Sequence, residues 1–158
     1  MTVRIPMTPG GADKLRAELR DLKGPQRLQN IKDIETARAH GDISENAEFE
    51  AAKHRQAHIE GRIHELEGKL SAADIIDPSK LSGDRVIFGA TVTLEDVDSG
   101  DEFVYQIVGE DEGDVKAGRI SVRSPIARAI VGKEGGDTAT VRTPGGEREL
   151  EIIGVEFK

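Results

Sequence analysis

The chain has 158 residues, enough for one ordinary domain or two small ones. With 33% charged residues, 3% aromatic residues and a formal net charge of −8, it lacks the basic face needed to wrap duplex DNA. The absence of cysteine excludes disulfides and thiolate metal sites, and no apolar run is long enough for a membrane span or a signal peptide. These properties predict a cytoplasmic protein.

The first forty residues predict a helix with one interruption. Thr8 can cap a helix that starts at Pro9, because proline is tolerated at the first helical position. The Gly24-Pro25 pair predicts a kink or a short break, after which the helix continues to about His40. The apolar stripes on the two sides of this pair are out of phase: Leu15, Leu19 and Leu22 before it, and Leu28, Ile31 and Ile34 after it.

A second long helix follows a stop at Gly41 and is expected to begin near Ser44. Its apolar residues take the four-three spacing of a coiled-coil seam from Ile59 onward, with Gln56 at a seam position nearer the helix start. A short connection makes the two helices antiparallel, and thirty helical residues would span roughly 45 Å. The apolar positions are Ala52, Ile59, Ile63, Leu66, Leu70 and Ala73.

The pattern changes after residue 76, which predicts an N-terminal helical domain over 1–76, a linker over 77–82 and a second domain over 83–158. Frequent glycine and alternating β-branched residues predict an α+β chain whose second domain is an antiparallel β-sheet. The segment 124–132 predicts its one short helix. The expected strands are 85–88, 90–95, 102–108, 119–122, 138–142 and 147–156.

Two carboxylates, Asp42 and Glu45, stand between the two long helices, in the segment 41–46 that we call the tip. One interpretation is a capping box, in which Asp42 caps the second helix and Glu45 reaches back to it. The other is metal binding, since two exposed carboxylates can share a hard cation such as Mg²⁺. Two ligands are too few for a closed site, so a second macromolecule would supply the others.

Basic and aromatic side chains flank the tip. Arg38, Lys53 and Arg55 either form ion pairs along the helices or hold a phosphate backbone beside the acidic residues. Phe49, the only aromatic residue of the first domain, either packs the end of the hairpin or stacks on a base. Residues 80–158 carry 10 basic and 16 acidic residues, so the second domain is acidic and a basic partner surface is predicted for it.

Six segments together resemble the bacterial Gre transcript cleavage factors, and the resemblance runs nearly end to end. It is nearer to the GreA branch than to the GreB branch of this family, whose coiled coil is more basic. The segment 37–49, with its Gly41-Asp42-Ile43-Ser44-Glu45-Asn46 tip, is the most specific of the six. The other five are 6–8, 60–63, 86–92, 124–129 and 143–147.

The resemblance implies an N-terminal antiparallel α-helical coiled-coil hairpin and a C-terminal domain similar to FK506-binding proteins (FKBP-like). It implies that the second domain docks on RNA polymerase and that the coiled coil enters the polymerase secondary channel. Asp42 and Glu45 would there help hold the second catalytic Mg²⁺ and position a water, so that backtracked RNA is hydrolysed near its 3′ end. The partners are then the polymerase elongation complex and the nascent RNA 3′ end, with no membrane, no small-molecule substrate and no free-standing enzymatic activity.

Further residue roles follow from the same resemblance. Arg38 and Lys53 match positions of the family's RNA-contacting basic patch, and the segment Ser124, Pro125 and Ile126 is implied to bind the polymerase. Ser44 stands where some members carry lysine, and Lys53 replaces an arginine, which loses a bidentate phosphate contact. Two alternatives stay open: an inhibitor that enters the channel without stimulating cleavage, and a peptidyl-prolyl isomerase suggested by the FKBP-like domain alone.

Overall fold

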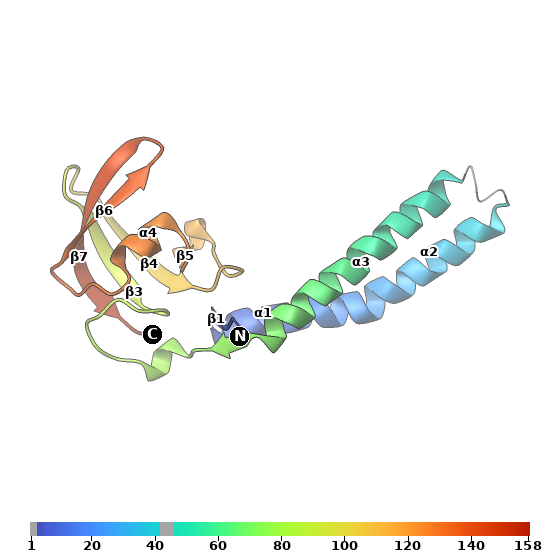
Figure 1. The fold of residues 1–158 in the computed structure, drawn as a ribbon, viewed down its shortest axis with the longest axis horizontal. Coiled ribbons are helices and arrows are strands. Elements are labelled where there is room, and N and C mark those ends of the chain that lie inside the picture. The colour runs from blue at the N-terminus through green and yellow to red at the C-terminus, as the bar shows by residue number, and fades with distance from the viewer. Residues whose placement is uncertain (1–2, 42–45) are drawn as a thin grey trace. The chain divides into compact units, whose positions relative to one another are not determined.

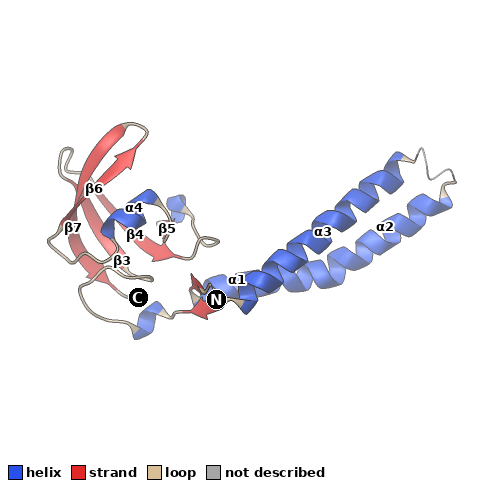
Figure 2. Ribbon diagram, in the orientation of Figure 1, coloured by secondary structure: helices blue, strands red, loops and turns tan. Residues whose placement is uncertain are grey.

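The computed structural model describes residues 3–41 and 46–158, and the chain divides into two compact units. One unit comprises Ala12–Ala72 and is helical (Figure 1). The other comprises Val3–Gly11 together with Ala73–Lys158 and contains all the described strands (Figure 2). The protein is therefore a mixed α+β chain with an N-terminal helical hairpin and a C-terminal β-sheet.

The first arm of the hairpin is one continuous helical rod with a π-helical turn inside it. α1 (Pro9–Asp21) runs through this turn (Leu22–Gln26) directly into α2 (Arg27–Ala39). The predicted interruption at Gly24-Pro25 is a π-helical turn and not a break in the helix, because the wider π turn takes up a proline that has no N–H to donate. Thr8 caps this rod as predicted, since its Oγ1 accepts a hydrogen bond from Gly11 N at 3.2 Å.

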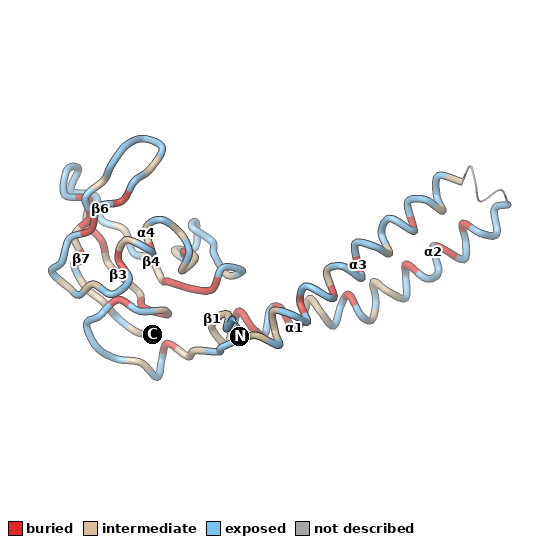
Figure 3. The backbone as a smooth tube through the Cα atoms, viewed as in Figure 1, coloured by how far each residue is buried: buried red, intermediate tan, exposed pale blue. Residues whose placement is uncertain are grey.

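The π turn also changes which residues of α2 face the second arm, α3 (Ala47–Ser71). Leu28 and Ile31, both predicted to lie in the seam, are 61% and 44% exposed. Asn30 and Ala37 are buried instead, together with Ile34, which was predicted correctly. Buried and exposed stretches alternate along both arms of the hairpin (Figure 3). The expected seam of α3 is confirmed at Ala52, Ile59, Ile63 and Leu66.

Two glycines on the exposed side of α3, Gly61 and Gly68, offer a test of this hairpin. A Cβ atom added at either position would meet nothing within 4 Å. We therefore expect Gly61→Ala and Gly68→Ala each to stabilise the hairpin by about 0.5–1 kcal/mol, because glycine loses more backbone entropy in a helix than alanine. Thermal unfolding followed by circular dichroism at 222 nm measures the change.

The matched control is Ala57→Gly, also on the exposed side of α3, which should lower the midpoint by a similar amount. A lower midpoint for the double alanine variant would contradict the open surroundings of the two glycines.

The second unit is built on a five-stranded sheet in the order β5-β4-β3-β7-β6. The neighbours pair antiparallel except β4 and β5, which are parallel, so the predicted purely antiparallel sheet needs this correction. The predicted strand 85–88 is also wrong, since only Arg85 forms an isolated bridge, to Glu134. The strands are β3 (Thr91–Asp96), β4 (Glu102–Val108), β5 (Arg119–Ser121), β6 (Thr138–Thr143) and β7 (Gly146–Glu156).

One face of this sheet forms the core of the unit, and the short helix α4 (Pro125–Ile130) packs on it. Alternate residues of β3 are buried, as the period of two in a strand requires. Ala127 and Ile130 of α4 are fully buried in the same cluster. The other buried members are Val86, Ala90, Val92, Leu94, Ile107, Ile120, Ala139, Val141, Leu150 and Ile152.

A short parallel pair, β1 (Ile5–Met7) with β2 (Ala73–Ile75), was not predicted. The Glu112 carboxylate joins this pair to the rest of the second unit: it accepts hydrogen bonds from Thr8 N at 3.0 Å and Gly109 N at 2.9 Å, and it also contacts the Thr8 hydroxyl. The predicted linker contains a 3₁₀ turn (Pro78–Lys80) capped by the Asp77 carboxylate.

Candidate functional site

The second arm of the hairpin begins with a side-chain cap. α3 starts at Ala47, and the N-cap residue is Asn46, whose Oδ1 accepts hydrogen bonds from Glu48 N at 3.0 Å and Phe49 N at 3.1 Å. The helix therefore starts later than the expected start near Ser44, and the residue that caps α3 is Asn46 and not Asp42. Residues 42–45, and with them both predicted metal ligands Asp42 and Glu45, lie outside the described residues.

The first arm ends where the sequence predicted. His40 is the C-cap residue of α2, with its N–H donating to Ala37 O at 3.2 Å. Gly41 follows with a φ of 105°, in the region that only glycine adopts without strain. Gly41 and Asn46 flank the segment 42–45, which we call the acidic segment. Both residues thus lie at helix ends.

Polar contacts tie the two arms together close to these ends. Asn46 Nδ2 donates to Ala37 O at 2.6 Å, and His40 Nδ1 lies 2.9 Å from Glu48 Oε2. Further along the seam, the buried Asn30 Nδ2 donates to Ala52 O at 2.9 Å. The end of the hairpin is therefore held by side-chain hydrogen bonds in addition to its apolar seam.

The predicted RNA-contacting residues lie on this same part of the hairpin and are exposed. The Arg38 guanidinium carbon lies 5.9 Å from the centre of the Phe49 ring, a distance at which a cation and an aromatic face attract each other. Lys53 Nζ donates to Gln56 Oε1 at 2.9 Å. Arg38 and Lys53 thus make local contacts only with neighbours on the hairpin among the described residues, and their contact with RNA stays a prediction.

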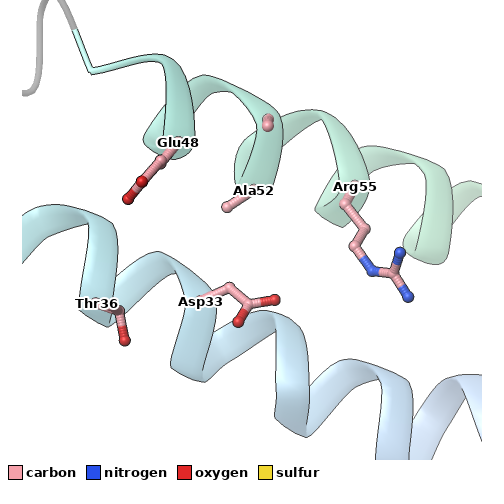
Figure 4. A pocket seen from close by; sticks show the side chains of 6 residues that line it. Asp33, Thr36, Glu48, Ala52 and Arg55 are labelled. Carbon is pink, nitrogen blue, oxygen red and sulfur yellow. The ribbon is translucent and has the colours of Figure 1, made fainter.

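Arg55, the third basic candidate, lines a shallow groove between α2 and α3. The groove is lined by Asp33 and Thr36 of α2 and by Glu48, Ala52 and Arg55 of α3 (Figure 4). Because both acidic and basic groups line this groove, it favours neither an anion nor a cation. We assign no ligand to it.

Bidentate ion pairs join the two arms further from the tip. The Arg62 guanidinium contacts both Glu18 carboxylate oxygens, at 2.7 and 2.9 Å, and also Glu65 at 3.1 Å. Arg27 pairs with Glu60 in the same way, at 3.1 and 2.7 Å. Pairs of this geometry restrict rotation and sliding between helices, because two parallel hydrogen bonds must be satisfied at once.

These pairs give the hairpin a pH dependence with a defined sign. The hydrogen bond from Arg62 lowers the pKa of Glu18 below its ordinary value of 4.5, and Arg62 together with Lys69 lowers the pKa of Glu65. A lowered pKa in the folded state means stability that is present above the ordinary pKa and is lost as the pH falls through the folded value. We expect the thermal midpoint at 222 nm to decline below about pH 4.5.

The comparison variant for this measurement is Glu18→Gln, which should show a shallower decline than the unsubstituted chain. Glu35→Gln, at an exposed position on α2, is the matched control for the loss of one carboxylate. Equal profiles for all three proteins would contradict the role given to the Glu18–Arg62 pair.

The segment predicted to bind the polymerase belongs to the sheet unit. Ser124 caps α4 through its Oγ, which accepts from Ala127 N at 3.3 Å, and Pro125 is the exposed first residue of that helix. Ile126 is half-buried against the core. These contacts explain why Ser124, Pro125 and Ile126 form a helix start, and their contact with a polymerase remains a prediction.

Sequence reasoning did not single out Asn30 or Asn46. The signal for Asn46 was present, since asparagine is a preferred cap and the helical pattern follows it directly. Asn30 could not be placed in the seam because the phase shift at the π turn was not foreseen. Among residues 3–41 and 46–158, no three His, Asp or Glu side chains are grouped to hold a metal ion. In the same residues, no helix combines the length and the apolar character required to span a membrane.

Two models of one protein family match successive parts of the chain. The family model described as "Transcription elongation factor, N-terminal" matches residues 5–75, and the model "Transcription elongation factor, GreA/GreB, C-term" matches residues 81–157. The chain is 58% identical to Transcription elongation factor GreA of Anaeromyxobacter sp. (strain K), over 98% of this chain and 93% of that protein. It is 56% identical to the protein of the same name from Neisseria meningitidis serogroup B, over 98% of both chains.

A solved structure, the GreA factor homolog 1 (Gfh1) protein of Thermus thermophilus, is 32% identical over 97% of this chain and 99% of its own, with a TM-score of 0.43. The two family models together account for most of the sequence, and both relatives align almost from end to end. The chain therefore belongs to the GreA/GreB family of transcription elongation factors.

Proposed function

We propose that this chain binds RNA polymerase and stimulates the polymerase's own cleavage of backtracked RNA, which rescues arrested elongation complexes. The single observation that carries the proposal is the Asp42-Ile43-Ser44-Glu45 segment at the end of a braced two-helix hairpin, in a chain of the GreA/GreB family. In this proposal the helical hairpin Ala12–Ala72, within the predicted domain 1–76, is the inserted coiled coil, 77–82 is a linker and 83–158 is an FKBP-like domain that docks on the polymerase. Ser124, Pro125 and Ile126 contribute to that docking.

The hairpin is suited to deliver two carboxylates over a distance. α3 has 25 residues, and at about 1.5 Å per residue it spans roughly 37 Å. Bidentate ion pairs and a buried seam hold α3 against the first arm. Such a hairpin places its end accurately, and small misplacements of reacting groups lower rates steeply.

The donor chemistry of the tip fits a hard divalent cation. Asp42 and Glu45 supply carboxylate oxygens, the donors that Mg²⁺ prefers, and Mg²⁺ commonly takes only one or two carboxylates from a protein. We propose that these two residues hold a Mg²⁺ ion shared with the polymerase active site and orient a water. A second metal, when bound, supplies charge stabilisation for both the attacking and the leaving oxygen of an in-line displacement.

The remaining groups near the tip act on the RNA. Arg38 and Lys53 are exposed on the two arms and carry the positive charge that would hold the phosphates of the extruded 3′ segment. The chain is not an enzyme on its own in this proposal, because two carboxylates do not complete a metal site.

A halted polymerase complex with a labelled transcript tests the proposal. Adding the protein and Mg²⁺ should shorten the RNA from its 3′ end and restore extension when nucleotides are supplied, whereas omitting Mg²⁺ should prevent both. Slower extension without shortened RNA would overturn the proposal in favour of a channel-binding inhibitor.

A further inference from the structure

One side chain, that of Asn46, makes hydrogen bonds at both helix ends that flank the acidic segment. Its Oδ1 accepts from Glu48 N and Phe49 N, at 3.0 and 3.1 Å, and so caps α3. Its Nδ2 donates to Ala37 O of α2 at 2.6 Å. The start of α3 and the last turn of α2 are thereby joined through a single amide group.

Capping alone does not explain why this residue is an asparagine. Aspartate and serine cap helices about as well, because only an acceptor oxygen is needed. The amide differs from a carboxylate by carrying N–H donors beside its acceptor oxygen. The donor is used on Ala37 O, one of the last carbonyls of α2, which has no partner four residues ahead within the helix.

Further along the seam, a second asparagine, on α2, donates to a backbone carbonyl of α3. Asn30 of α2 is 2% exposed and donates from Nδ2 to Ala52 O of α3 at 2.9 Å. A buried asparagine in a coiled coil lowers stability relative to an apolar residue but fixes the register of the helices. Sliding one helix past the other by one residue, about 1.5 Å, would break both asparagine contacts at once.

We infer that Asn46 and Asn30 are positioning residues for transcript cleavage: they fix the two ends of the acidic segment and the register of α2 against α3. This inference rests on the proposed function, in which Asp42 and Glu45 act at a metal held by the polymerase. Neither asparagine is proposed to touch RNA or metal. Their role is to set where the hairpin presents the acids.

The experiment separates the role of the Asn46 amide oxygen, which caps α3, from that of its N–H donor. Asn46→Asp and Asn46→Ser both keep a capping oxygen, and neither retains the amide donor that reaches Ala37 O. The aspartate variant adds a negative charge and the serine variant does not, so an effect shared by both cannot arise from charge.

We expect both variants to stay folded, with the thermal midpoint at 222 nm changed by only a few degrees. The single-turnover cleavage rate on a halted complex should fall at least about tenfold in both, because a small displacement of a reacting group lowers the rate steeply. The affinity for polymerase, measured by competition with the unsubstituted chain, should stay within about twofold.

Amide hydrogen exchange supplies a readout that does not depend on the polymerase. The His40 amide, which also donates to Ala37 O, should exchange several-fold faster in both variants, because the last turn of α2 has lost its hydrogen bond from Asn46. The Glu48 and Phe49 amides should keep their protection, since the capping oxygen remains.

Asn30→Leu extends the test to the register. This variant should unfold at an equal or higher temperature and yet cleave at least about threefold more slowly, because the apolar seam is strengthened while the register is released. A residue with a merely structural role would move stability and rate in the same direction.

The outcomes distinguish this inference from the function beneath it. If both Asn46 variants cleave at the unsubstituted rate while Asp42→Asn does not, the positioning role is wrong and the function stands. Unchanged exchange at His40 would also overturn the positioning role. If the unsubstituted chain yields no shortened RNA, the proposed function itself is wrong.

Discussion

Replacing Asp42 by Asn, or Glu45 by Gln, is expected to lower stimulated RNA cleavage at least about a hundredfold. Loss of a residue that only supports a metal ligand already costs about 10–100-fold in activity, so loss of a ligand should cost at least as much. Both substitutions keep the size of the side chain and remove its charge, which is the property a divalent cation requires. The measurement is the single-turnover rate of transcript shortening on a halted complex at saturating protein.

Polymerase affinity should be nearly unchanged in these variants, because the proposed docking surface lies in the sheet unit. Competition against the unsubstituted chain measures this affinity. The matched control is Glu50→Gln, which removes one exposed carboxylate from the first turn of α3 and should cleave at the normal rate. Retained cleavage in a double Asp42→Asn, Glu45→Gln variant would reject the role given to the tip.

The architecture of the hairpin could be predicted because helix seams follow local rules. The four-three spacing from Ile59 to Leu66 placed α3 against its partner correctly, and Gly41 marked the end of α2. The phase of the first arm could not be predicted in the same way. The π turn around Pro25 holds more residues than a regular α-helical turn, so it shifts the phase of all the residues that follow. Asn30 therefore lies in the seam and Leu28 is exposed.

Pairings between strands that lie far apart in the sequence could not be predicted either. β1 and β2 have three residues each and pair across more than sixty positions, so neither shows an alternating pattern long enough to indicate a strand. The parallel pairing of β5 with β4 likewise depends on the path of the chain around residues 109–118. The longer strands β4 and β7 were predicted closely, because their alternation is carried by many residues.

The candidate site could likewise be predicted only in part. Residue type, spacing and the resemblance to a family predict metal binding by Asp42 and Glu45, and this stays a prediction because both residues lie outside the described residues. The hydrogen bond between the two helix ends could not be predicted, because it depends on which backbone carbonyl of α2 the Asn46 side chain reaches. A residue's type reveals what it can bond, and only the fold reveals what lies within its reach.

In the sheet unit, Ile152→Ala is expected to lower the free energy of unfolding by about 2–5 kcal/mol. Ile152 is fully buried in β7 and pairs with Leu94 of β3, so its truncation leaves a cavity between the sheet and α4. The adjacent Ile153 is 46% exposed. Ile153→Ala should therefore cost no more than about 1 kcal/mol, the range of strand preferences at an exposed position.

Urea unfolding followed by tyrosine fluorescence can measure this difference in the sheet unit alone. The chain has one tyrosine and no tryptophan, and Tyr105 packs against the same core as Ile152. Circular dichroism at 222 nm, which is dominated by the helices, should show the hairpin transition almost unchanged in Ile152→Ala. Equal losses for Ile152→Ala and Ile153→Ala would contradict the burial pattern of β7.

The same pair of variants connects stability to function. If the sheet unit docks the protein on the polymerase, Ile152→Ala should reduce both affinity and cleavage at elevated temperature, and saturating protein should restore the cleavage rate. Asp42→Asn should instead retain affinity and stay inactive at any protein concentration. Rescue by concentration therefore separates loss of docking from loss of chemistry, because only a binding defect is overcome by mass action.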